Sequence, residues 1–177
     1  NAPQLREYTQ VIIDEADRLQ ELMQRLLSSH RTMQPTLVNM HEILERVRRL
    51  ILAEFPGIAV RRDYDTSLPD VMGDREQLIQ AVLNIAHNAA QALAERIVAG
   101  DACITLRTRI ARQVTLGKQR YRLALELHIQ DNGPGVPESI REHIFYPLVS
   151  GREGGSGLGL TLAQTFVQQH QGTIECE

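Results

Sequence analysis

The stretch Asn84–Ala89, which reads Asn-Ile-Ala-His-Asn-Ala, places two asparagines four residues apart inside a long helical pattern. Residues four apart in a helix share a face, so Asn84 and Asn88 point the same way. The amide oxygen of asparagine is a neutral, hard ligand that suits Mg²⁺, an ion that usually also holds substrate phosphates. Such a pair alone is more typical of a solvent-facing surface. The apolar and β-branched residues around this pair instead predict a position at the rim of a pocket.

A second polar stretch, Asp131–Pro137, reads Asp-Asn-Gly-Pro-Gly-Val-Pro and follows a predicted strand. A carboxylate at the end of a strand can accept a hydrogen bond from the exocyclic amine of adenine, whereas the carbonyl of guanine would be repelled there. Gly133 and Gly135 permit unusual backbone angles and a close approach to a ring. By itself this stretch is more typical of a turn.

A third stretch, Gly151–Leu160, is rich in glycine and leads into a helix. Backbone N–H groups at a helix N-terminus bind phosphate, and glycines let the chain wrap around the anion. A glycine-rich loop alone is weak support for a phosphate site. This one is not a Walker A motif, because no Gly-Lys-Ser/Thr follows. It also lies outside any βαβ unit, which excludes a dinucleotide fingerprint.

Hydrophobic periodicity around these stretches predicts an alternation of helices and strands. The predicted helices span residues 5–27, 38–53, 74–98 and 158–170, and the predicted strands span 58–63, 102–111 and 120–130, with another strand beginning at Gly172. Asp74 is expected as the N-cap of the third helix. Residues 116–118 are expected to turn an antiparallel hairpin, and residues 28–33 to form a linker. This order favours an α+β two-layer sandwich over a doubly wound parallel sheet.

The N-terminal helix carries a heptad-like seam. Positions 5, 8, 12, 19, 22 and 26 are Leu, Tyr, Ile, Leu, Leu and Leu, with Glu at position 15 of the same series. Alternating spacings of three and four residues are typical of a coiled coil or helical bundle. We therefore expect a partner helix. Because the first residue is Asn and residues 174–177 read as the middle of a strand, we expect a fragment cut at one or both ends.

Composition narrows the function classes. The chain has 177 residues, of which 42% are hydrophobic and 23% charged, which allows one ordinary soluble domain plus an appendage. A formal net charge of −3, with three Phe, four Tyr and no Trp, argues against a nucleic-acid partner. Two cysteines, Cys103 and Cys176, are too few for a disulfide framework and predict reduced thiols of a cytoplasmic protein. No apolar run approaches the ~20 residues that span a bilayer, and no signal peptide is visible, so no membrane partner is expected.

Taken together and in this order, the three stretches resemble the N, G1 and G2 boxes of the GHKL ATP-binding superfamily. That superfamily contains histidine kinases, gyrase-type ATPases, Hsp90 and MutL. Phe145–Leu148 resembles the F box of histidine kinases, and His170–Ile174 resembles the segment after G2, where the family often has a Gly pair. The resemblance covers about residues 36–177. It implies a Bergerat-type fold with ATP as ligand, Mg²⁺ as its metal and a lid between G1 and G2, which we expect to be mobile over residues 137–156.

Two features favour a kinase within this superfamily. ATP-hydrolysing relatives typically have Glu at the first N-box position, whereas this chain has Asn84, and Asn is not a general base at neutral pH. The helix over 5–27 resembles the second helix of a histidine-kinase dimerisation domain. No H box is present. The nearest match, His41-Glu42-Ile43-Leu44, is followed by Glu45-Arg46, where an H box would have Asn-Pro or Thr-Pro. The acceptor histidine is therefore expected outside residues 1–177.

The resemblance narrows to the nitrogen-regulation sensor histidine kinases, on residues 2–8, the long hairpin over 102–130 and residues 146–155. Many histidine kinases have a Thr-Lys pair near Ser150–Arg152, and here Arg152 keeps the positive charge. Gln91 stands where many relatives have Lys, so this position supplies no positive charge toward the phosphates.

The resemblance also implies roles for individual residues. The positions expected to contact ATP are Asn84, His87, Asn88, Gln91, Asp131, Gly133, Gly135, Val136, Tyr146, Arg152, Ser156, Gly157, Leu158, Gly159 and Leu160. Catalytic roles are implied for Asn84, Asn88 and Arg152, with Mg²⁺ held by Asn88 and assisted by Asn84. The backbone N–H groups of residues 157–159 are expected to bind phosphate.

The expected organisation is a dimerisation helix and linker over residues 1–30 and a catalytic ATP-binding domain over 31–177. The implied partners are the histidine-bearing domain of the same homodimeric kinase, a response regulator and a PII-type signalling protein, with phosphatase activity toward the regulator. The alternatives are a gyrase- or Hsp90-type ATPase, an anti-sigma-type serine kinase, which normally lacks the N-terminal helix, and a degenerate ATP-binding scaffold.

Overall fold

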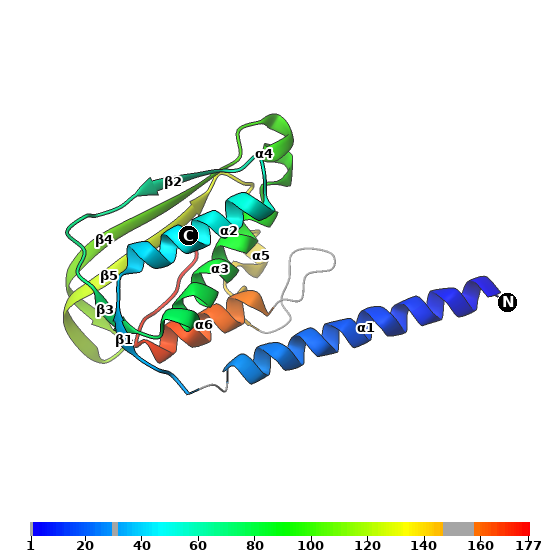
Figure 1. The fold of residues 1–177 in the computed structure, drawn as a ribbon, viewed down its shortest axis with the longest axis horizontal. Coiled ribbons are helices and arrows are strands. Elements are labelled where there is room, and N and C mark those ends of the chain that lie inside the picture. Colours follow the sequence, from blue (N-terminus) through cyan, green and yellow to red (C-terminus); the bar gives the residue numbers. More distant parts are fainter. Residues whose placement is uncertain (1, 30–31, 147–157) are drawn as a thin grey trace.

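The computed structural model describes residues 2–29, 32–146 and 158–177 (Figure 1). Its elements, in chain order, are α1 (Ala2–Ser29), β1 (Thr36–Val38), α2 (Met40–Glu54), β2 (Ala59–Asp63), β3 (Val71–Gly73), α3 (Arg75–Gln91), α4 (Ala94–Ala99), β4 (Cys103–Leu116), β5 (Gln119–Asp131), α5 (Glu138–Arg141) and α6 (Gly159–Gln169). The predicted α+β class is confirmed.

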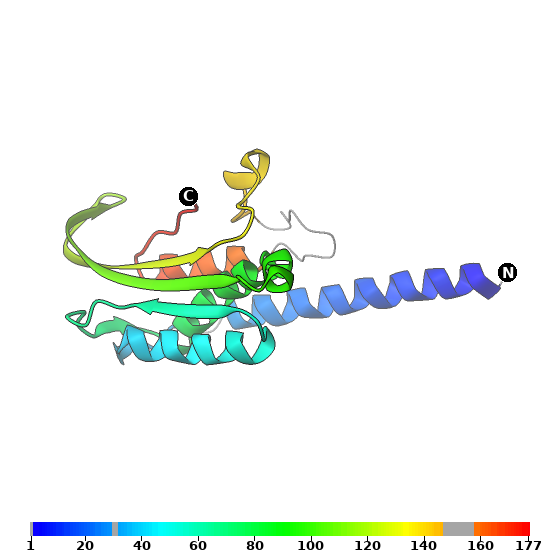
Figure 2. The same cartoon turned by 90° about the horizontal axis from the view of Figure 1, so that it is seen from above.

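The main sheet has the order β2-β4-β5, with β2 and β4 parallel and β4 and β5 antiparallel. A small second sheet pairs β1 with β3. The core lies between the main sheet and two helices: Ile43 and Val47 of α2 and Val82 of α3 are buried with Ile104 and Leu106 of β4. The helix α6 packs beside α3 (Figures 1 and 2). Helices thus cover one face of the sheet, which confirms the two-layer sandwich.

The helix expected over residues 5–27 is confirmed, and α1 extends away from the sandwich as one long rod (Figure 2). Its seam faces solvent, since Leu5, Tyr8 and Ile12 are 66%, 67% and 69% exposed. Apolar side chains in such a row are stable in water only when another surface covers them. None of the described helices is both long enough and apolar enough to cross a membrane.

The helix expected from Asp74 to about Val98 is in fact two helices. Its start is right: the Asp74 side chain accepts hydrogen bonds from the N–H groups of Glu76 and Gln77. However, α3 ends at Gln91, where the chain tightens into turns and Leu93 becomes completely buried. Burial of Leu93 in the core therefore breaks the regular helix before α4 begins.

Three further expectations differ from the structure. The second helix begins at Met40 rather than Val38, because Thr36–Val38 forms β1 against β3. Both of these short strands were missed, since three residues carry no readable alternation. The strand expected at Gly172 is wrong: residues 172–177 pair with no strand in the described part of the chain.

The predicted hairpin is confirmed, and its two strands, β4 and β5, are longer than expected.

The last turn of α6 suggests a stabilising substitution. The N–H groups of Gly172 and Gln171 donate to the carbonyls of Val167 and Gln168, both at 2.9 Å, which is a Schellman motif. Gln171 has φ 61°, a left-handed conformation that costs a non-glycine residue about 1–2 kcal/mol. Glycine avoids this strain, but it also raises the conformational entropy of the unfolded chain. On balance we expect Gln171→Gly to raise the free energy of unfolding, measured with urea, by about 0.5–1 kcal/mol. Gln169→Gly, inside the helix, should destabilise it, and the reverse order would contradict this account.

The side chain of Gln77 is an amide buried in the core without hydrogen bonds among the described residues. Its side chain is 3% exposed, and neither Nε2 nor Oε1 has a hydrogen-bond partner among the described residues. Each such buried group costs about 1–3 kcal/mol. We therefore expect Gln77→Met, which keeps the length, to raise the free energy of unfolding by about 1–3 kcal/mol. Gln169→Met, on the exposed part of α6, is the control and should change stability by less than about 0.5 kcal/mol.

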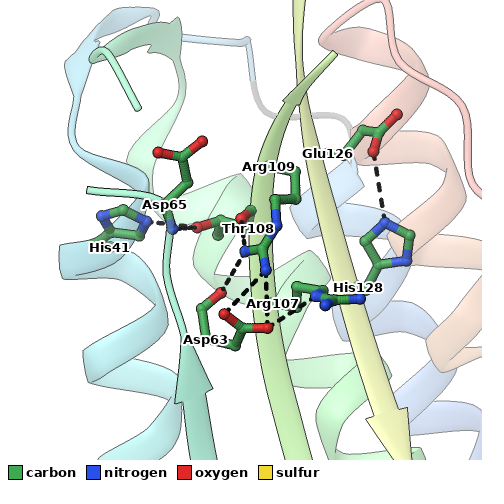
Figure 3. A network of polar contacts seen from close by, with 8 residues as sticks. All are labelled: His41, Asp63, Asp65, Arg107, Thr108, Arg109, Glu126 and His128. Atoms are coloured by element: carbon green, nitrogen blue, oxygen red, sulfur yellow. Dashed lines mark hydrogen bonds and ion pairs between the residues drawn. The ribbon is translucent and has the colours of Figure 1, made fainter. Parts of the chain in front are cut away.

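Charged residues lock β2 to β4 on the sheet face away from the helices (Figure 3). Asp63, the last residue of β2, accepts from Arg107 at 2.9 Å and from Arg109 through both carboxylate oxygens at 3.0 Å. The hydrogen bonds from Arg109 and then Arg107 hold the pKa of the Asp63 carboxyl below its usual value. The two ion pairs therefore favour the ionised form and fix the register of these strands.

A buried hydroxyl joins the helix layer to the sheet. Thr108 of β4 is completely buried, and its Oγ1 lies 2.8 Å from Nε2 of His41 on α2 and accepts from the N–H of Asp65 at 3.0 Å (Figure 3). The ring of His41 stacks on Tyr64 with centroids 4.5 Å apart. Burial and the neighbouring Glu45 carboxylate raise the pKa of Tyr64, so this hydroxyl stays protonated. These contacts hold α2 on the sheet.

Candidate functional site

The helix α3 carries the two asparagines predicted as metal and nucleotide ligands. Asn84 donates from Nδ2 to the carbonyl of Gly159 at 3.1 Å, and its Oδ1 accepts from Gln80 at 2.7 Å. Asn88 lies one turn further along α3 and is half-buried. The predicted N box therefore lies directly beside the first residue of α6. The separation of Asn84 and Gly159 in sequence is 75 residues, so this contact depends on the fold.

The loop after β5 approaches the C-terminal end of α3, at Ala92. Asp131 is half-buried and accepts from the N–H of Gly133 through Oδ1 at 2.8 Å. A Cβ at Gly133 would lie 2.8 Å from that oxygen and 3.2 Å from the carbonyl of Ala92, so only glycine fits. No hydrogen bond to Oδ2 of Asp131 is formed within the described residues. One carboxylate oxygen of Asp131 thus shapes the loop.

A residue without an assigned role in the sequence analysis, Asn132, holds this loop in place. Its Oδ1 accepts from the N–H of Cys103 at 2.9 Å, and its Nδ2 donates to the carbonyl of Asp101 at 2.8 Å. The side chain thereby pins the loop after β5 to the start of β4. Its only signal in sequence is its place between Asp131 and Gly133. Its role depends on contacts about 30 residues away, which a motif does not reveal.

The loop continues through two predicted contacts. Gly135 has φ 81°, the left-handed region that glycine adopts without strain. Val136 is half-buried, and its carbonyl accepts from Arg141 of α5 at 3.4 Å. These two residues therefore turn the chain from β5 toward α5.

The predicted F box is tied to α6. Thr161 in the first turn of α6 donates from Oγ1 to the carbonyl of Phe145 at 2.8 Å. Tyr146 is 57% exposed, and its ring meets His143 edge to face with centroids 5.2 Å apart. The described part of the F box is therefore anchored by its backbone, and the aromatic ring of Tyr146 lies at the surface.

Two further residues predicted to contact the nucleotide, His87 and Gln91, also lie on α3. His87 of α3 points to α2, where Nε2 lies 2.8 Å from Glu54 and the ring meets Phe55 edge to face. Gln91, the last residue of α3, is exposed. His87 therefore bridges two helices in this structure. A contact of either residue with nucleotide stays a prediction.

The remaining predicted residues lie at or beyond the start of α6. Leu158, Gly159 and Leu160 form its first turn and are half-buried. Arg152, Ser156 and Gly157 lie outside the described residues, as does residue range 147–157 of the expected lid. The described part of the lid consists of α5 and the turn that follows it.

The arrangement suits a phosphate ligand with a hard metal ion. Amide oxygens are the ligand type that Mg²⁺ prefers, and Asn88 and Asn84 lie on one face beside the N-terminus of α6, where a helix dipole favours anions. Among the described residues no group of three His, Cys, Asp or Glu side chains could hold a metal.

Comparison with known proteins defines the class. The family described as histidine kinase-, DNA gyrase B-, and HSP90-like ATPase matches residues 73–177, which is more than half of the chain. The chain therefore belongs to this family. A solved structure of a mycobacterial sensor histidine kinase, MprB, has a TM-score of 0.60 and 27% identity, over 78% of this chain and 82% of that one.

More particular relatives match nearly the whole chain. It is 46% identical to the sensory histidine kinase/phosphatase NtrB of Vibrio alginolyticus over 99% of its length, and 48% identical to that of Klebsiella oxytoca over 98%. The resemblance to histidine kinases of the nitrogen-regulation type is confirmed. The chain spans about half the length of these relatives, 49% in each case.

Proposed function

We propose that this chain is the ATP-binding catalytic part of an NtrB-type two-component sensor kinase, and that it transfers the γ-phosphoryl group of ATP to a histidine outside residues 1–177. The hydrogen bond between Asn84 and Gly159 is the observation that carries the proposal. It puts a face of amide ligands against the N-terminus of a helix, where phosphates bind. Near the C-terminal end of α3, Asp131 keeps one carboxylate oxygen for a base.

Each group then has one role. Oδ2 of Asp131 accepts the exocyclic amine of adenine, and the loop shaped by Gly133 and Gly135 lies along the ring. The N–H groups of residues 157–159 bind phosphate oxygens, and Arg152 supplies positive charge. Asn88, assisted by Asn84, would hold Mg²⁺, and the ion would supply neutralisation of the phosphate charge. Transfer then depends mainly on position and electrostatics, as in other phosphoryl transfers.

The proposal extends to the parent protein. Residues 1–30 form the dimerisation helix and linker, and residues 31–177 form the catalytic domain. The exposed seam of α1 is the reason for the first assignment, because it fits a four-helix dimer. The proposed partners are the histidine-bearing domain of a homodimeric kinase, a response regulator that the parent also dephosphorylates, and a PII-type protein. The proposed location is the cytoplasm.

A family ATPase is the second candidate, and the environment of Asn84 disfavours it. Activation of water needs a general base at this position. Both amide atoms of Asn84 are engaged, by the Gln80 side chain and by the backbone carbonyl of Gly159, and neither partner is a carboxylate. A degenerate scaffold that binds no Mg·ATP, and a serine kinase, are the other outcomes of the test below.

Phosphotransfer in trans tests the proposal. The chain is mixed with radiolabelled ATP, Mg²⁺ and a separate helical hairpin that carries an intact H box from a nitrogen-sensor kinase. We expect acid-labile label on the hairpin histidine, and none when that histidine is changed to Gln or when the chain is incubated alone. Release of free phosphate without label would support the ATPase. Acid-stable label would support the serine kinase, and absence of Mg·ATP binding would support the scaffold.

A further inference from the structure

His170 ends α6 and forms two hydrogen bonds that fix its protonation state. Its Nε2 lies 2.9 Å from the backbone N of Asp74, and its Nδ1 lies 2.7 Å from the carbonyl oxygen of Phe166. A backbone N–H only donates and a carbonyl only accepts. Nε2 is therefore the acceptor and Nδ1 carries the proton, so the ring is neutral and in a single tautomer. The ring thus joins the end of α6 to the start of α3, across 96 residues of sequence.

Asp74, the partner of His170, is buried and held in place by its own hydrogen bonds. Asp74 is 1% exposed; its Oδ1 caps α3, and its Oδ2 accepts from the N–H of Gln34 at 2.9 Å. The ring also packs on Gly73, where a Cβ would lie 3.1 Å from Nε2 of His170. The position of the imidazole is therefore set by backbone on one side and by a buried N-cap on the other.

The opposite end of α6 carries the proposed phosphate site. α6 has 11 residues and is about 16 Å long, and its first residue, Gly159, accepts from Asn84 of the same helix α3. Between the two ends, Leu162, Ala163 and Phe166 pack on Ala81 of α3. Within the described residues, a polar contact thus joins the two helices at each end, and an apolar seam lies between these contacts.

We propose that His170 is a positioning residue for nucleotide binding: through Asp74 it sets the axial position of α6 on α3, and so places the phosphate-binding turn at Gly159 beside the ligand face of Asn88. The inference rests on the proposed function and deepens it. His170 touches no reacting atom in this account. Its effect reaches the nucleotide through a rigid helix that is held at its far end.

Three substitutions separate this role from plain helix capping. His170→Gln places an amide oxygen near the position of Nε2, so it keeps the acceptor for Asp74. His170→Asn keeps a donor for Phe166 but is too short to reach Asp74, and His170→Phe keeps the ring and loses both bonds. His128→Phe, on the exposed side of β5, is the matched control.

The affinity for Mg·ATP and amide hydrogen exchange are measured on variants that circular dichroism shows to be folded. We expect His170→Asn and His170→Phe to weaken binding about tenfold and to reduce protection of the Leu162 amide, which closes the first turn of α6. His170→Gln and His128→Phe should stay within about threefold of the original chain. Wild-type affinity in both His170→Asn and His170→Phe would overturn the proposal.

Hydrogen exchange also separates the two hypotheses. If the unmodified chain binds no Mg·ATP, the proposed function fails, and the exchange data still decide the role of His170. Loss of protection at Leu162 in His170→Asn but not in His170→Gln supports positioning by the bond to Asp74. Equal protection in these two variants overturns it, whether or not nucleotide binds.

Discussion

Changing Asp131 to Asn is expected to weaken Mg·ATP binding by about 10- to 100-fold while the fold is kept. Oδ1 of Asp131 accepts from the N–H of Gly133 at 2.8 Å, and the proposed acceptor for adenine is the other oxygen. Asparagine has one oxygen and one NH₂ group. Whichever way the amide is turned, one donor faces another donor, either the adenine amine or the N–H of Gly133. An unmatched polar contact in a binding site costs about 1–3 kcal/mol, which is about 5- to 150-fold in affinity.

Isothermal titration calorimetry with Mg·ATP measures this effect. The matched control is Glu126→Gln on the same strand, whose exposed side chain lies on the outer face of the sheet and should leave the affinity unchanged. Binding of the Asp131→Asn variant within about threefold of the original chain would sink the assignment of Asp131 to adenine. Such a result would leave the phosphate end of the site untouched.

Local patterns predicted those elements whose cause is local. The cap at Asp74, the turn at Gly117 and the start of α6 follow from residues next to one another in sequence, and all three are present. The strands β1 and β3 pair Thr36 with Gly73, and neither has enough residues to show a period. The break after Gln91 depends on burial of Leu93 in the core, which no local pattern reports.

In the candidate site, too, features with a local cause were predicted and features that depend on distant residues were not. The resemblance of the three stretches to the N, G1 and G2 boxes implied that Asn84, Asp131 and Gly159 belong together, and the contact of Asn84 with Gly159 agrees with that implication. The supporting residues were not predicted, because Asn132 and His170 act on partners 29 and 96 residues away. His87 stands inside the N box, yet its ring lies against Glu54 of α2. Membership of a motif therefore does not tell which way a side chain points.

Changing Asn88 to Ala is expected to lower the rate of phosphotransfer in trans by at least about 100-fold, with a much smaller loss of nucleotide affinity. Alanine is the best helix former, so α3 should persist. The substitution removes the amide oxygen proposed as the metal ligand. A metal that neutralises charge developing on the transferred group contributes several kcal/mol to the transition state. Binding of the adenine end depends on Asp131, which lies at the end of β5 and not on α3 with Asn88, and should be retained.

Two measurements on this variant make the assignment of the metal ligand specific. The first compares the rate of histidine labelling at saturating ATP with that of Gln168→Ala, an exposed amide on α6 that should behave like the original chain. The second measures ATP affinity with and without Mg²⁺. Because the ion adds to binding only where a ligand holds it, the gain on adding Mg²⁺ should shrink in Asn88→Ala and persist in Gln168→Ala. A full magnesium gain in Asn88→Ala would instead move the metal to Asn84 or to a residue outside the described part of the chain.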